Sequence, residues 1–164
     1  MKRVNIVTRA LQPHELETAS RIIQTAIQDS PYYNEWSKRE ERALHSPSKL
    51  RAMLEADPEG VIGAFADDDL AGVITYDVDA GLAWLSWIAV AREWRQQGVA
   101  HALMRALETG AVARGAHKIW CDSRVENIPS ARMLETHGYH VTVTLENHWY
   151  GLDFYLWEKT LEGR

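Results

Sequence analysis

An arginine, a glycine and an alanine stand at fixed spacing between a predicted strand and a predicted helix, in the order Arg95-x-x-Gly98-x-Ala100. An apolar run over residues 85–90 precedes them, and an amphipathic pattern begins directly after the glycine. A glycine here lets the backbone approach a ligand without a side chain in the way. The free N–H groups and positive dipole end of the helix start attract anions. The segment therefore predicts an anion cradle suited to a pyrophosphate.

A carboxylate stands where the next predicted strand ends. The strand over 82–90, the helix over 98–114 and the strand over 117–122 form a βαβ crossover, so the two strands should be parallel neighbours. Ligands of open sheets bind beyond the carboxyl ends of such strands. Asp122 lies at that end and is a candidate general base. Alternatively, it orients a loop or pairs with Arg124.

Other phosphate-binding patterns fit this chain less well. No Gly-Lys-Ser/Thr follows the turn, as a P-loop requires, and the chain has no G-x-G-x-x-G for a dinucleotide fold.

Two segments resemble the GNAT family of N-acetyltransferases. The spacing from Arg95 to Ala100 resembles the family's acyl-CoA signature, Q/R-x-x-G-x-G/A. Downstream, the segment from Asn127 through Gly138 and Tyr139 resembles the family pattern N-x-x-A…Y-E-x-x-G-F/Y. The resemblance is strongest over residues 61–160.

The resemblance implies a binding site for acetyl-CoA. The strand over 82–90 would carry a bulge, pair with the pantetheine arm, and polarise the thioester carbonyl with a backbone N–H. Arg95 either adds charge, shapes the loop, or is solvated, and Asn127 either binds a pantetheine amide or caps the next helix. The expected cofactor-binding residues are Ile88, Ala89, Val90, Arg95, Gln96, Gln97, Gly98, Val99, Ala100, His101, Asn127 and Ser130.

The resemblance also bears on the chemical step. Residues 119–124 resemble Leu-Trp-Leu-Glu-Val-Arg of the bacterial ribosomal-protein alanine N-acetyltransferases, where the acid is the proposed base, and this favours Asp122 as catalytic residue. The family tyrosine that protonates the leaving thiolate falls at Leu134, which cannot do so. Tyr139, Tyr150 or water supplies the proton, or the thiolate leaves unaided, since a thiol pKa near ~8.5 makes a fair leaving group.

Other residues bear on where the amine acceptor binds and on whether a metal site is expected. In the family the loop over 146–153 borders the acceptor site, so we expect Trp87, Trp149 and Tyr150 to contact substrate; a packed hairpin tip is the alternative for the last two. His137 and His140 flank a helix end without a cysteine partner, so no metal site is expected.

Composition narrows the class of protein. The 164 residues suit a single domain over 1–164. A net charge of −5 gives no basic footprint for nucleic acid, and no apolar run is long enough to span a membrane. With one cysteine and no apolar stretch in the first residues, we expect a cytoplasmic protein, as monomer or homodimer.

Periodicity and turn residues predict an α/β (α+β) chain of the order βααβββαβαββ, which is the GNAT order. We expect a mixed, mostly antiparallel, twisted sheet of about seven strands flanked by helices, with a parallel pair splayed to hold acyl-CoA. The expected strands are 4–9, 61–66, 70–78, 82–90, 117–122, 139–145 and 153–160, and the expected helices are 13–29, part of 32–57, 98–114 and 128–137.

Together these patterns predict an acetyl-CoA-dependent N-acetyltransferase. The acceptor is a primary amine that attacks the thioester directly, on a small molecule, a peptide or a protein. The alternative is a non-catalytic acyl-CoA-binding or sensor module of the same fold.

Overall fold

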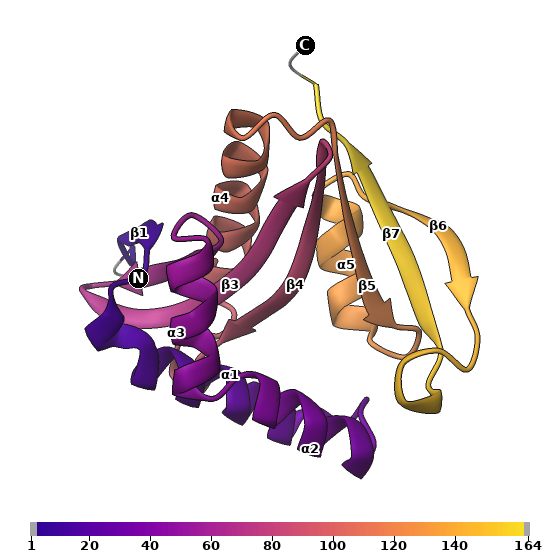
Figure 1. The fold of residues 1–164 in the computed structure, drawn as a ribbon, viewed down its shortest axis with the longest axis horizontal. Helices are drawn as coiled ribbons and strands as arrows, with labels where there is room; N and C mark the ends of the chain where they lie inside the picture. Colours follow the sequence, from indigo (N-terminus) through magenta and orange to yellow (C-terminus); the bar gives the residue numbers. More distant parts are fainter. Residues whose placement is uncertain (1–2, 163–164) are drawn as a thin grey trace.

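The computed structural model describes residues 3–162 and shows one mixed sheet flanked by helices (Figure 1). The strands are β1 (Ile6–Ala10), β2 (Val61–Ala66), β3 (Asp69–Asp79), β4 (Leu82–Val90), β5 (Lys118–Arg124), β6 (His140–Leu145) and β7 (Phe154–Thr160). The helices are α1 (Leu16–Asp29), α2 (Glu35–Leu44), α3 (Pro47–Ala56), α4 (Val99–Ala113) and α5 (Ile128–Thr136).

The predicted elements are present, with two differences at the N-terminal end. Residues 13–15 form a 3₁₀ turn, so α1 begins only at Leu16. The segment 32–57 divides into α2 and α3, because Asn34 and Ser46 each cap a new helix by accepting a hydrogen bond from a backbone N–H three residues on. Three helices therefore stand between β1 and β2, where the sequence pattern indicated two.

The sheet contains one parallel pair. The strand order is β1-β2-β3-β4-β5-β7-β6, and every neighbouring pair except β4 and β5 is antiparallel. This confirms the mixed, mostly antiparallel seven-stranded sheet expected from the sequence.

The parallel strands stay together for only three residues. Leu82–Trp84 of β4 pairs with Lys118–Trp120 of β5, and beyond this point the two strands separate (Figure 1). The register of β3 against β4 shifts between Tyr76–Leu85 and Thr75–Trp87, which leaves Ser86 as an extra residue in β4. This is the bulge expected in the strand over 82–90, and a bulge bends a strand and increases its local twist.

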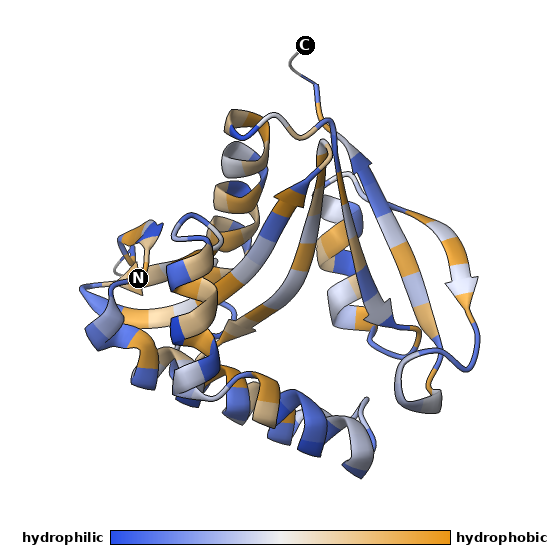
Figure 2. Ribbon diagram, viewed as in Figure 1, coloured by the Kyte–Doolittle hydropathy of each residue, from blue (hydrophilic) through white to orange (hydrophobic). Residues whose placement is uncertain are grey.

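Helices cover both faces of the sheet. Adjacent residues of a strand face opposite sides, and accordingly Val73 packs in the core cluster with α1 and α3, whereas Ile74 packs in the cluster with α4. Figure 2 shows hydrophobic residues concentrated in the central strands, while α2 is mostly hydrophilic. None of the helices between residues 3 and 162 is long and apolar enough to cross a membrane.

The start of α4 packs closely on the sheet. A Cβ added at Gly72 of β3 would lie 2.8 Å from Val99 Cγ1 and 2.9 Å from the backbone oxygen of Ala89. Only a glycine therefore permits this approach, which fixes the first turn of α4 beside the end of β4.

Candidate functional site

A cavity of about 550 Å³ lies between the separated halves of β4 and β5. Its walls also include residues of α2, α5 and the β6–β7 loop. Seven residues singled out from the sequence line it: Trp87, Ile88, Asp122, Asn127, Ser130, Trp149 and Tyr150. The β-sheet therefore brings the predicted catalytic, acceptor and pantetheine groups to one cavity.

Asp122 forms part of the cavity wall near the end of β5. Its Oδ2 accepts a hydrogen bond of 2.8 Å from the indole Nε1 of Trp149. It does not pair with Arg124, which donates to the backbone oxygens of Tyr32 and Asp153 instead. The carboxylate is thus held by a neutral donor, and the pairing with Arg124 that the sequence left open does not occur.

Burial raises the pKa of Asp122, and the negative charge of Glu41 adds to this shift. The hydrogen bond from Trp149 and the nearby imidazole of His148 act in the opposite direction. A carboxylate with a raised pKa is a stronger base, so it accepts a proton from a nucleophile more readily than an exposed aspartate does.

A second carboxylate, Glu41 of α2, also lines the cavity. Its Oε1 accepts a hydrogen bond of 2.7 Å from the hydroxyl of Tyr150, and its Oε2 accepts one of 3.0 Å from the indole Nε1 of Trp87. His45 of the next turn lies near it, with Nδ1 3.9 Å from Oε2. Glu41 therefore connects α2 to β4 and to the β6–β7 loop.

Aromatic rings surround these carboxylates. The ring of Trp87 lies 6.0 Å from that of Tyr33 and 5.4 Å from that of His45, centroid to centroid. Burial, together with the charges of Asp122 and Glu41, raises the pKa of the Tyr33 hydroxyl. Burial also raises the pKa of Tyr150, as does the hydrogen bond that it donates to Glu41. Both hydroxyls are therefore protonated at neutral pH.

The predicted anion cradle lies between the end of β4 and the start of α4. Gly98 has φ +89°, and the nearest heavy atom to a Cβ added there is Ile6 Cδ1 at 3.8 Å. The first helical hydrogen bond runs from Ala102 N to Gly98 O. The amides at the start of α4 therefore precede the intrahelical hydrogen bonds, as an anion site requires.

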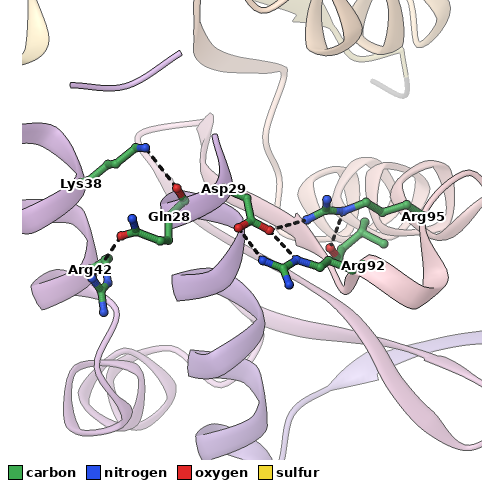
Figure 3. Close-up of polar contacts among 7 residues, drawn as sticks. Gln28, Asp29, Lys38, Arg42, Arg92 and Arg95 are labelled. Atoms are coloured by element: carbon green, nitrogen blue, oxygen red, sulfur yellow. Dashed lines mark hydrogen bonds and ion pairs between the residues drawn. The ribbon is translucent and has the colours of Figure 1, made fainter. Parts of the chain in front are cut away.

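The Arg95 side chain is turned toward α1 rather than standing free in the loop (Figure 3). Its Nε donates to the backbone oxygen of Val90, and its guanidinium lies 4.0 Å from Asp29 at the end of α1. Arg92 forms a bidentate pair with the same carboxylate, at 2.5 and 2.6 Å. This geometry favours the loop-shaping role among those left open for Arg95.

The remaining residues predicted to bind the cofactor lie at the end of β4, in the loop after it and at the start of α4. Ala89, Val90, Gln96, Gln97, Val99 and Ala100 follow the cavity-lining part of β4 in chain order. The His101 imidazole faces His137 instead of the loop, with Nδ1 2.8 Å from Nε2. Of His101, only the amide is therefore available to the cradle.

Asn127 both caps α5 and lines the cavity. Its Oδ1 accepts a hydrogen bond of 3.2 Å from Ser130 N, the capping role that the sequence offered as the alternative. The Asn127 Nδ2 is not used by the cap. The same residue can therefore start α5 and donate to a ligand.

Neither Tyr139 nor Cys121 is suited to act as a chemical group in the cavity. Tyr139 is buried beside Lys159 and does not line the cavity, so it is not placed to donate a proton there. Burial raises the pKa of the Cys121 thiol, which keeps it protonated and unreactive. Within residues 3–162, no three His, Cys, Asp or Glu side chains are grouped to hold a metal ion.

The cavity is also lined by Tyr33, Glu41 and His45, which no sequence pattern predicted. These residues lie on α2 and its flanking loops, about 80 residues from Asp122, and no motif marks them. The only local signal is the spacing of Glu41 and His45, which puts an acid and an imidazole on one helical face.

Residues 24–139 match the sequence profile described as the Acetyltransferase (GNAT) family. No curated protein sequence is similar enough to be matched.

Solved structures share the fold at low sequence identity. The PaiA N-acetyltransferase of Thermoplasma acidophilum, in complex with coenzyme A, is 21% identical with a TM-score of 0.83, covering 95% of this chain and 99% of that one. The ribosomal-protein-alanine N-acetyltransferase of Brucella melitensis is 19% identical with a TM-score of 0.73, covering 94% and 99%. The yncA protein of Salmonella typhimurium, with its cofactor acetyl-CoA, is 16% identical with a TM-score of 0.73, covering 97% and 95%.

The burial of Asp122 predicts that Asp122→Asn stabilises the fold. A raised pKa means that the charged carboxylate is less favourable in the folded chain than in the unfolded chain, while Asn retains an acceptor for Trp149. The gain should be absent below about pH 4, grow as the pH rises through the pKa of folded Asp122, and then level off. Thermal unfolding should show a rise of roughly 2–4 °C for each kcal/mol of penalty removed.

Asp79→Asn, at an exposed position at the end of β3, serves as the control and should leave the melting temperature unchanged. An Asp122→Asn protein that melts at the wild-type temperature at every pH would show that the carboxylate is not penalised by burial.

Proposed function

Because the chain belongs to the GNAT family of acetyltransferases, we propose that it transfers the acetyl group of acetyl-CoA to a primary amine, by direct attack of the amine on the thioester. The observation that carries this proposal is the cavity between β4 and β5, which has Asp122 in its wall and continues along β4 toward the turn at Gly98.

The residues present fit a CoA thioester. Beyond Trp84 the β4 edge that faces β5 is no longer paired with it, so those backbone groups of Ile88, Ala89 and Val90 that point away from β3 are candidates to bind the amides of a pantetheine arm. A Cβ added at Gly98 would meet no atom closer than 3.8 Å, and the amides at the start of α4 precede the first intrahelical hydrogen bond, which suits a pyrophosphate. Asn127 supplies a side-chain amide to the same cavity.

Asp122 acts as the general base in this proposal. The amine nitrogen bonds to the thioester carbon, its proton passes to Asp122 directly or through one water, and the carbon–sulfur bond breaks. A backbone N–H of β4 polarises the carbonyl during the attack. Trp149 holds the carboxylate through its indole N–H, so the base has a fixed orientation before substrate arrives.

Position 134, where the family pattern has a tyrosine, is occupied by a leucine that is buried and lines the cavity. The protonated hydroxyls of Tyr33 and Tyr150 also line it, but Tyr150 already donates to Glu41. The departing thiolate leaves without a dedicated acid in this proposal, since a thiol pKa near ~8.5 allows it, and takes its proton from water.

The cradle is tested with Gly98→Asp. Acetyl-CoA at about a hundred times its dissociation constant should raise the melting temperature of the wild type by roughly 5–10 °C, because it binds only the folded chain. Gly98→Asp should abolish this rise, since a side chain at a backbone with φ +89° adds both bulk and negative charge where the pyrophosphate lies.

Gly98→Ala introduces the same backbone strain without the charge, and it should retain part of the ligand-induced rise. A folded Gly98→Asp protein with the wild-type response would place the cradle elsewhere.

The two roles of Asn127 are separated by two substitutions. Asn127→Ala should lower the melting temperature through loss of the helix cap and weaken CoA binding by about 1–2 kcal/mol. Asn127→Asp keeps an oxygen acceptor for Ser130 N but lacks the amide donor, so it should preserve stability while still weakening CoA binding. Calorimetric titration with CoA measures both variants, and unchanged affinity in both would leave Asn127 as a cap only.

Asp122→Asn tests the chemical step. Near neutral pH it should lower amine-dependent release of CoA thiol by roughly 10²-fold, the usual scale for a general base, with little change in CoA affinity. The deficit should narrow as the pH rises, because the fraction of amine already deprotonated then increases.

Normal turnover by Asp122→Asn across the pH range would leave positioning and backbone polarisation as the mechanism. Wild-type protein that binds acetyl-CoA but releases no thiol with any amine would favour the alternative, a non-catalytic acyl-CoA-binding or sensor module.

A further inference from the structure

Two carboxylates face one cavity without a lysine or arginine partner. Asp122 and Glu41 both line it, one from β5 and one from α2. Their hydrogen-bond donors are the neutral side chains of Trp149, Trp87 and Tyr150. Within residues 3–162, no lysine or arginine forms an ion pair with either.

Other partly buried carboxylates of this chain are neutralised. Glu15 pairs with Arg9, Asp57 with Arg114, and Glu158 with Lys118. Glu41 has a side chain only 18% exposed, comparable to Glu15 at 11% and Glu158 at 22%, yet within residues 3–162 the only basic side chain that it contacts is His45. The cavity therefore concentrates negative charge that the fold leaves to be balanced from outside.

The cavity wall also suits cations. The rings of Tyr33, Trp87 and Tyr150 line it together with the carboxylates, and aromatic faces attract ammonium groups. Each Glu41 oxygen accepts one hydrogen bond, from Trp87 or Tyr150, and a carboxylate oxygen can accept a second. Glu41 can therefore bind an ammonium group without giving up Trp87 or Tyr150.

We infer that the acceptor is a small aliphatic primary amine with a second positive charge, of the diaminoalkane class, and that Glu41 binds its second ammonium group. This inference rests on the proposed function, in which Asp122 serves the reacting amine. Two carboxylates face two ammonium groups on binding, and only the one beside Asp122 must lose its proton to react.

The proton balance is consistent with this division. The reacting ammonium group gives one proton to Asp122 and becomes a neutral amine. Its nitrogen loses a second proton as the amide forms, and the departing thiolate or water accepts that proton. The group at Glu41 stays charged throughout, so Glu41 contributes to binding and orientation rather than to bond formation. The product keeps the positive charge of the ammonium group at Glu41, while the acetylated nitrogen beside Asp122 is an uncharged amide.

The test compares amines of matched length. Diaminoalkanes from 1,3-diaminopropane to 1,6-diaminohexane are each measured against the 1-aminoalkane of the same chain length, in amine-dependent thiol release from acetyl-CoA. The best diamine should exceed its monoamine in kcat/KM by roughly 10- to 100-fold, mostly through a lower KM, as expected for a desolvated charge pair. Added salt should reduce this preference.

Glu41→Gln should remove most of the preference by raising KM for the diamine. Glu35→Gln removes the same charge from an exposed position of the same helix and should retain the wild-type preference. The comparison within the wild type stands even if Glu41→Gln does not fold.

The outcomes separate the two proposals. Equal kcat/KM for diamines and monoamines would overturn the second ammonium site, while the proposed acetyl transfer stands. Better turnover of the N-terminal amine of a peptide without charged side chains would do the same. An unchanged preference in folded Glu41→Gln would overturn the role of Glu41. Acetyl-CoA binding without thiol release with any amine would overturn both.

Discussion

The separation of β4 from β5 is the constraint on which the rest of the site depends. β5 pairs with β7 over all of residues 118–124, whereas β4 pairs with β3 over its whole length and with β5 over only three residues. The extra residue at Ser86 adds local twist to β4 just after that pairing ends. The two halves of the sheet therefore diverge, and the cavity forms where a continuous sheet would have placed backbone hydrogen bonds.

The end of α1 holds α2 and the loop after β4 in fixed positions relative to each other. Asp29 binds Arg92 of the loop after β4, while the neighbouring Gln28 accepts hydrogen bonds from Lys38 and Arg42 of α2 (Figure 3). α2 carries Glu41, and the loop after β4 leads into Gly98. The last turn of α1 therefore connects the Glu41 side of the cavity to the predicted cradle. These contacts are exposed, so they set geometry more than they add stability.

Local features of the site were predictable from sequence, and long-range ones were not. A glycine turn before an amphipathic helix is visible in the sequence at Gly98, and strand alternation predicts the placement of Asp122 on β5, because both depend on neighbours in the chain. Glu41 comes from α2, in a segment with no motif, and only folding brings it to Trp87 and Tyr150. For Asn127 and Arg95 the sequence left several roles open, and the contacts that each side chain makes in the fold show the helix cap at Asn127 and favour the loop-shaping role for Arg95.

In the proposed mechanism, the charges of the cavity favour Asp122 as a base and are consistent with leucine at position 134, where the family pattern has a tyrosine. Burial, together with the nearby carboxylate of Glu41, raises the pKa of Asp122, which makes Asp122 a stronger base. The same negative potential would raise the pKa of a tyrosine at that position, as it does for Tyr33, and make it a weaker acid. A thiol has a pKa of about 8.5, so its thiolate needs less help to leave than an ammonium group needs to lose its proton. The chemistry therefore gains more from strengthening the base than from supplying an acid, and leucine at position 134 instead packs against the cavity floor as an apolar residue.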